Sequence, residues 1–161
     1  MIYAPIARWL MVAPTTPARS DWKDAMEREP EQAVAALVAA FSEGRLDDYF
    51  GCFAPDATFV FYTAPERLMS VEEYRALWDQ WVADDGFRVV SCRTSDTNVQ
   101  RFGDMAVVTH SVETRISTNE GEDTVHERET IVMARGADGR WLGVHEHLSP
   151  QPEDSDDGQS P

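Results

Sequence analysis

The chain has 161 residues, 42% of them hydrophobic, and a formal net charge of −15. Its length and composition are typical of one globular domain with its own core, which we expect in the cytoplasm. The acidic charge argues against nucleic acid and anionic membranes as partners, because both attract basic surfaces. No apolar run approaches the roughly 20 residues of a membrane helix. Cys52 and Cys92 lack a metal-binding spacing and are expected as reduced thiols.

Composition divides the chain into three segments. Residues 1–21 carry prolines that interrupt regular structure, so we expect an extended or disordered arm there. The folded domain is expected over residues 22–150. Residues 151–161 are acidic and almost free of apolar side chains, which predicts a disordered tail.

Helical patterns fill the first part of the domain. A first helix is predicted from Pro30, with apolar residues at helical spacing and Gly44 just beyond its end. A short second helix is expected over residues 46–53. A third begins at a capping box in residues 70–73 and ends before Gly86.

Strand patterns dominate the rest of the chain. Residues 58–62 predict a strand between the second and third helices. The later strands are expected at residues 87–94, 105–116, 124–135 and 140–149. Between the last two, Asp138-Gly139 is the signal of a type I′ hairpin turn. The pattern predicts an α+β fold: a curled antiparallel sheet with N-terminal helices closing a cone-shaped pocket.

Four stretches carry a resemblance to a known superfamily. They are the opening helix from Pro30, the run Leu46–Ala57, the helix Ser70–Trp81 and the ending Arg128–Ser149 with its DGRW and HEHLS segments. Over roughly residues 30–150 the chain resembles nuclear-transport-factor-2-like proteins, also called SnoaL-like or cystatin-like. The ending is most similar to the association (hub) domain of calcium/calmodulin-dependent protein kinase. The resemblance implies homodimers, and the superfamily includes isomerases, polyketide cyclases, dehydratases and non-catalytic binding proteins.

The chain departs from the pockets of these relatives. The kinase hub pocket relies on arginines, and the matching positions here are Val112, Ile131 and Leu148. The resemblance therefore does not carry over a hub-type anion site. The isomerases use an Asp base with Tyr and Asp donors, for which the chain offers no matching set.

Strand parity selects the candidate catalytic residues, because alternate residues of a strand face opposite sides. The last three strands each have one largely apolar face with an embedded titratable group. These faces are Ala106, Val108, His110 and Val112; Glu127, Glu129, Ile131 and Met133; and Leu142, Val144, Glu146 and Leu148. The hub resemblance places them inside the cone, which makes His110, Glu129 and Glu146 the candidates. Glu127, two residues before Glu129, is expected in solvent near the end of its strand. A β-bulge would reverse parity and select Thr109, Arg128, His145 and His147 instead.

The predicted pocket suits acid–base chemistry without a cofactor. Its walls are expected to include Tyr49, Tyr62, Trp78, Trp81, Ile131 and Leu148. Burial raises the pKa of a carboxyl group, and a neighbouring His can orient a carbonyl or relay a proton. Such a site suits isomerisation, cyclisation or dehydration of an apolar carbonyl compound. The alternatives are a non-catalytic ligand-binding or oligomerisation module and a purely structural polar network. No nucleotide-binding or serine-hydrolase motif is present in the sequence.

The HEH segment also has a metal interpretation. His145 and His147 lie two residues apart, on one face of a strand, and His126 or a carboxylate would supply a third ligand. In the superfamily, however, this face commonly forms the dimer sheet. We therefore expect dimer contacts here and no metal. The sequence does not indicate the substrate.

Overall fold

The computed structural model describes residues 29–152. Its elements in chain order are α2 (Pro30–Ser42), α3 (Leu46–Gly51), β1 (Phe53–Phe61), α4 (Val71–Asp85), β2 (Arg88–Phe102), β3 (Met105–Thr118), β4 (Gly121–Arg135) and β5 (Trp141–Pro150). The expected arm, residues 1–21, and nearly all of the expected tail lie outside the described residues. Within the described part, no helix is long and apolar enough to cross a membrane.

The helices begin and end where local chemistry predicts. Ser70 caps α4 by accepting a hydrogen bond from the Glu73 backbone N–H at 3.1 Å, and the Glu73 carboxylate accepts one from Met69 N–H at 2.7 Å. Gly86, with φ +63°, ends α4 in the left-handed conformation that glycine adopts most readily. The prediction of Ser70 as N-cap is thus confirmed, and Glu73 reaches back as expected but bonds Met69, one residue before the N-cap. Helix α3 ends at Gly51, two residues earlier than expected.

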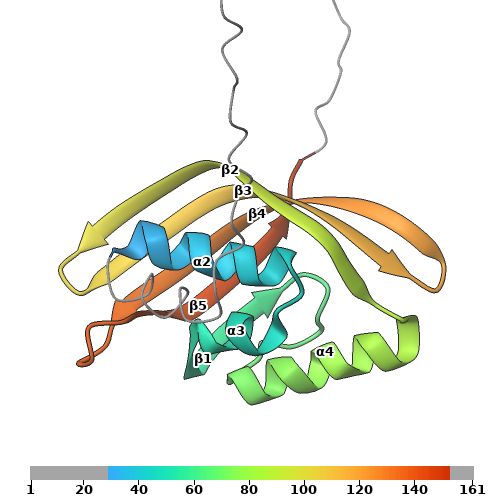
Figure 1. Ribbon diagram of the computed structural model, residues 1–161, viewed down its shortest axis with the longest axis horizontal. Helices are drawn as coiled ribbons and strands as arrows, with labels where there is room; N and C mark the ends of the chain where they lie inside the picture. The colour runs from blue at the N-terminus through green and yellow to red at the C-terminus, as the bar shows by residue number, and fades with distance from the viewer. Residues whose placement is uncertain (1–28, 153–161) are drawn as a thin grey trace, which may run out of the picture.

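The sheet has five strands in the order β1-β5-β4-β3-β2. Neighbours from β5 to β2 are antiparallel, but β1 runs parallel to β5, so the sheet is mixed and the expectation of a purely antiparallel sheet was wrong. The difference arises because β1 pairs with the last strand, far away in sequence. In Figure 1 the long strands arch over α2 and α3, while α4 lies along one end. The predicted α+β fold with helices against a curled sheet is confirmed.

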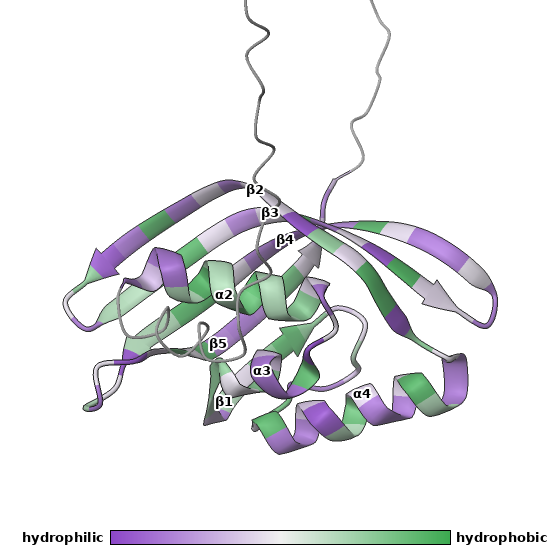
Figure 2. Cartoon of the chain, viewed as in Figure 1, coloured by the Kyte–Doolittle hydropathy of each residue, from purple (hydrophilic) through white to green (hydrophobic). Residues whose placement is uncertain are grey.

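The core fills the concave side of this sheet. Buried side chains from α2 and α3 meet those of β1, β3 and β4, and these include Leu37, Phe50, Phe59, Val108, Ile131 and Met133. Helix α4 contributes Tyr74 and Trp78 from one side only. Figure 2 shows the result as alternating hydrophobic and hydrophilic bands along α4.

A β-bulge in β5 decides which residues face the core. Val132 pairs with His145, whereas the next residue of β4, Met133, pairs with Gly143. Val144 is therefore the extra residue, and parity reverses across it. The bulge precedes Glu146, so the second half of β5 keeps the orientation that the sequence predicts.

The first half of β5 has the opposite orientation to the one expected. Trp141 and Gly143 are buried, whereas Leu142 and Val144 are only partly buried. Placing Leu142 and Val144 on the face of Glu146 was therefore wrong. Gly143 fits because its N–H donates to Cys52 O at 2.9 Å and a Cβ there would lie 2.5 Å from Phe53 Cδ1.

The β4–β5 loop is not the expected type I′ turn. Gly139 has φ +84°, but Asp138 has no positive φ, which a type I′ turn requires. Gly136 N–H donates to Arg140 O at 2.8 Å and closes a three-residue loop. A glycine at the end of such a loop is the usual alternative hairpin geometry.

Candidate functional site

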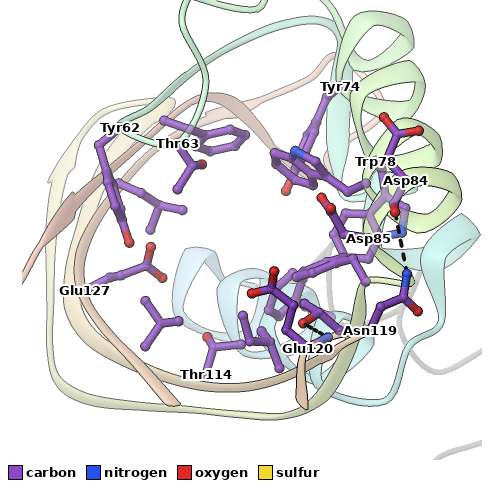
Figure 3. Close-up of a pocket in the computed structure, with 18 residues that line it drawn as sticks. Tyr62, Thr63, Tyr74, Trp78, Asp84, Asp85, Thr114, Asn119, Glu120 and Glu127 are labelled. Atoms are coloured by element: carbon purple, nitrogen blue, oxygen red, sulfur yellow. Dashed lines mark hydrogen bonds between the residues drawn. The ribbon is translucent and has the colours of Figure 1, made fainter. Parts of the chain in front are cut away.

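A cavity of about 590 Å³ opens between α4 and the inner face of the sheet. Its walls come from α2, α4 and the residue before β2, from β3, β4 and the turn between them, and from the ends of β1 and β5. They consist of Phe41, Phe61, Tyr62, Thr63, Tyr74, Trp78, Trp81, Asp84, Asp85, Phe87, Thr114, Ile116, Thr118, Asn119, Glu120, Val125, Glu127 and Leu148. Figure 3 shows Tyr62 and Glu127 on one side of this space and Asp85 and Glu120 on the other.

A smaller chamber of about 40 Å³ lies further in. Five residues line both spaces: Phe41, Tyr74, Thr114, Glu127 and Leu148. The two spaces are therefore neighbouring parts of one cone, wide at the mouth and narrow at the floor. Tyr49, Glu129 and Glu146 line the small chamber but not the wide cavity.

The floor carries a hydrogen-bonded chain of polar groups. His110 Nε2 bonds the Glu129 carboxylate. The Tyr49 hydroxyl donates to Glu146 Oε2 at 3.4 Å and lies 3.3 Å from the Tyr74 hydroxyl. Strands β3 and β4 set His110 directly opposite Glu129 in register, so the first contact follows from strand pairing alone.

Glu146 is the most perturbed carboxyl group of the site. Its side chain is buried, with 2% of the residue exposed. Burial raises its pKa well above the usual range, and the negative charge of Glu129 and a hydrogen bond to Glu129 raise it further. Glu146 therefore favours its protonated form, which can donate a hydrogen bond inside an apolar cavity.

Glu127 occupies the junction between mouth and floor. Burial raises the pKa of Glu127, while a hydrogen bond with Tyr62 lowers it. Burial and the interaction with Glu127 together raise the pKa of Tyr62 to about 12. The sequence interpretation placed Glu127 in solvent near the end of its strand, which was wrong. Its parity, shared with Glu129, was the signal that could have placed it in the cavity.

The other sequence candidates are distributed unevenly. Tyr62, Trp78, Trp81 and Leu148 line the wide cavity, and Tyr49 lines the floor. Ile131 is fully buried and His110 almost so, and neither belongs to the residues lining either space. His110 thus lies behind Glu129, where it can hold that carboxylate but not touch a ligand.

Sequence reasoning missed several lining residues, among them Phe41, Tyr74, Asp85 and Glu120. Tyr74 and Phe41 read as ordinary helix core residues, because helical periodicity does not distinguish a core from a cavity wall. Asp85 and Glu120 belong to chain segments that meet only in three dimensions.

The HEH histidines lie away from the cone. His145 Nδ1 is 2.8 Å from Thr58 Oγ1, and His147 is exposed. His126 pairs opposite Glu113, six residues along β4 from the partner of His145. Within residues 29–152 no three His, Cys, Asp or Glu side chains are placed to hold a metal ion together.

The sequence model of the SnoaL-like domain matches residues 31–153, which is most of the chain. The chain belongs to the SnoaL-like domain family. No curated protein sequence matches this SnoaL-like chain significantly.

Solved structures share the SnoaL-like fold. A nuclear transport factor 2-like protein from Salmonella enterica has a TM-score of 0.68 and 12% identity, covering 85% of this chain and 99% of that one. A ketosteroid isomerase-like protein from Erwinia carotovora has a TM-score of 0.64 and 17% identity, covering 76% of this chain and 94% of that one. The S. rosetta CaMKII hub has a TM-score of 0.62 and 24% identity, covering 84% of this chain and 100% of that one. At these identities the likeness shows a common fold.

Proposed function

We propose that this SnoaL-like protein binds a small, largely apolar carbonyl compound in its cone and catalyses a cofactor-free proton transfer, as an isomerase, cyclase or dehydratase does. The observation that carries the proposal is the pair of carboxyl groups, Glu129 and Glu146, at the floor of an aromatic cavity. Paired carboxyls that interact strongly hold one proton between them and divide the roles of acid and base.

Each floor residue has a role in this proposal. The Glu129 carboxylate removes a proton beside the substrate carbonyl. Protonated Glu146 and the Tyr74 hydroxyl donate hydrogen bonds to the oxygen on which negative charge develops. His110 acts as a positioning residue, because its contact with Glu129 restricts that carboxylate without reaching the cavity.

Proton exchange tests this proposal without knowledge of the natural substrate. The protein should accelerate deuterium uptake at the α-carbon of an apolar ketone such as 2-tetralone in D₂O, followed by NMR. Glu129→Gln should reduce that rate roughly 10²–10⁴-fold, the usual contribution of a general base. Glu122→Gln, an exposed carboxylate on the same strand, is the matched control and should leave it unchanged. If Glu129→Gln binds the ketone and still exchanges it at the full rate, the acid–base proposal is wrong.

A second candidate function is oligomerisation, and the outer face of the sheet supports it. Residues there pair across strands without any charged side chain at the centre: Val60 opposite His147, His147 opposite Thr130, and Thr130 opposite Thr109. An uncharged centre on an open sheet face is unusual on a chain of net charge −15 and suits contact with a second copy. Exposed Arg128 borders this centre on β4. We propose a cytoplasmic homodimer that uses this face, whether or not the cone is catalytic.

Sedimentation tests the dimer. The wild type should sediment as a dimer at micromolar concentration, and Thr130→Arg, which places two like charges at the centre of a symmetric interface, should shift it to monomer. Thr124→Arg changes an exposed residue near the start of β4. This variant is the control and should remain dimeric. A monomeric wild type would contradict the proposal.

A further inference from the structure

The charged groups that line the cone are all acidic. Asp84, Asp85, Glu120 and Glu127 line the wide cavity, and none of its lining residues between 29 and 152 is Lys, Arg or His. Glu129 and Glu146 add two more carboxyl groups at the floor. Among residues 29–152, none of the four in the wide cavity forms an ion pair with a basic side chain.

Two separate elements bring these carboxylates to one opening. Asp84 and Asp85 end α4, and Glu120 lies in the β3–β4 turn. The Asn119 N–H donates to Asp85 O at 2.7 Å and joins the turn to the helix end. Helix α4 also directs its carbonyl end, the negative end of its dipole, towards this opening. The mouth therefore has a negative potential, which no basic side chain offsets among the described residues that line it.

The walls beside these acids are aromatic. Trp78, Trp81 and Phe87 pack edge to face or tilted, with ring centroids 5.2 to 6.4 Å apart. All three line the cavity. An aromatic face attracts a cation as well as an apolar skeleton, and the attraction increases when the cation is desolvated.

We propose that the ligand of this cone is an organic cation, whose apolar or aromatic skeleton carries an ammonium group in addition to the carbonyl group of the proposed reaction. Its ammonium group lies between Glu127 on one wall and Asp85 and Glu120 on the other, and its skeleton lies against Trp78 and Trp81. This inference rests on the proposed function because it concerns the same cavity, and it names the class of compound that binds there.

The repulsion between Glu127 and Glu129 supports this choice. Burial raises the pKa of Glu127, the hydrogen bond with Tyr62 lowers it, and the charge of Glu129 raises it. A bound ammonium would supply a positive charge and favour the ionised carboxylate. A carboxylate or phosphate ligand would meet four acids and no donor side chain of positive charge, while a neutral ligand would leave the repulsion unrelieved.

Three probes of similar size separate these cases: 2-phenylethylamine, 2-phenylethanol and 3-phenylpropanoate, each titrated into the full chain at neutral pH by calorimetry. The amine should bind at least tenfold more tightly than the alcohol, the propanoate should show no binding, and added salt should weaken only the amine. Glu127→Gln should reduce the preference for the amine about tenfold. Glu122→Gln, outside the cavity, should preserve it, and thermal melting should show both variants folded.

Equal affinity for the amine and the alcohol would overturn the cation inference while leaving small-molecule binding intact. A preference for the amine that survives Glu127→Gln together with Asp85→Asn would also overturn it, because the charge would then be recognised elsewhere. Failure of all three probes to bind at millimolar concentration would overturn it as well. The ketone exchange experiment is independent of these outcomes, so failure of catalysis and failure of cation recognition are distinguishable.

Discussion

Replacing Glu146 with Gln should make the protein more stable at neutral and alkaline pH, by roughly 0.5–2 kcal/mol in the free energy of unfolding. Glutamine has the same shape, can accept the hydrogen bond from Tyr49 and can donate one to Glu129. It removes the cost of ionising a carboxyl group that is buried and next to another acid. Stability and proposed activity should therefore change in opposite directions.

The sign of the pH dependence follows from the raised pKa of Glu146. Its protonated form is favoured in the folded state, so its stabilising contribution is complete below the unfolded pKa, about 4.3. That contribution is lost as pH rises through the folded pKa, by at most about 1.4 kcal/mol per pH unit. The variant lacks this decline, so its advantage over the wild type should increase with pH.

Urea unfolding at a series of pH values between 5 and 9 measures this difference. Glu122→Gln is the matched control, since its carboxylate is exposed and pairs only with Arg115 across the hairpin among the described residues. Parallel pH profiles for wild type and Glu146→Gln would show that the floor carboxyl titrates normally. The acid role proposed for Glu146 would then lose its basis.

Truncating Trp78 should cost far more stability than truncating Trp81. Trp78 is only 5% exposed and its ring meets Phe41, Tyr49, Phe50, Tyr74 and Phe87. Removing a large buried aromatic side chain typically costs about 3–5 kcal/mol. Trp81 is half-buried, so we expect a loss of roughly 1–2 kcal/mol for Trp81→Ala, in the usual range for single substitutions.

Chemical denaturation of the two alanine variants measures both losses, and titration with 2-phenylethylamine then separates stability from binding. Trp81→Ala should remain folded and lose affinity for the amine, because the Trp81 ring lines the cavity and is only partly buried in the core. Equal stability losses for Trp78 and Trp81 would contradict this division between core and ligand contact. Retained affinity in Trp81→Ala would remove that residue from the binding surface.

The helical part of the molecule was predictable because its signals are local. Pro30 and Gly44 bracket the first helix, and Ser70, Glu73 and Gly86 bracket α4, through hydrogen bonds that span only a few residues. Which residues of a strand share one side was predictable for the same reason. Parity, together with the hub resemblance, placed Glu129 and Glu146 on the inner face, and both line the floor of the cone.

Distant pairing was decided only by the tertiary structure. The parallel alignment of β1 with β5 and the bulge at Val144 depend on which strand lies beside which, and no local pattern encodes them. The bulge reversed the orientation of Leu142 and Val144 relative to the prediction. Glu146 kept its predicted orientation because the bulge lies two residues before it.

The sequence by itself determined the α+β class, the capped helices and the shared parity of the floor carboxyls with apolar residues of their strands, since each depends on patterns within a turn or along one strand. The tertiary structure decided that His110 lies behind Glu129, that Glu127 enters the cone, and that Asp85 meets Glu120 at its mouth. A cavity and its charge are properties of surfaces from several elements, so they arise only when those elements pack together.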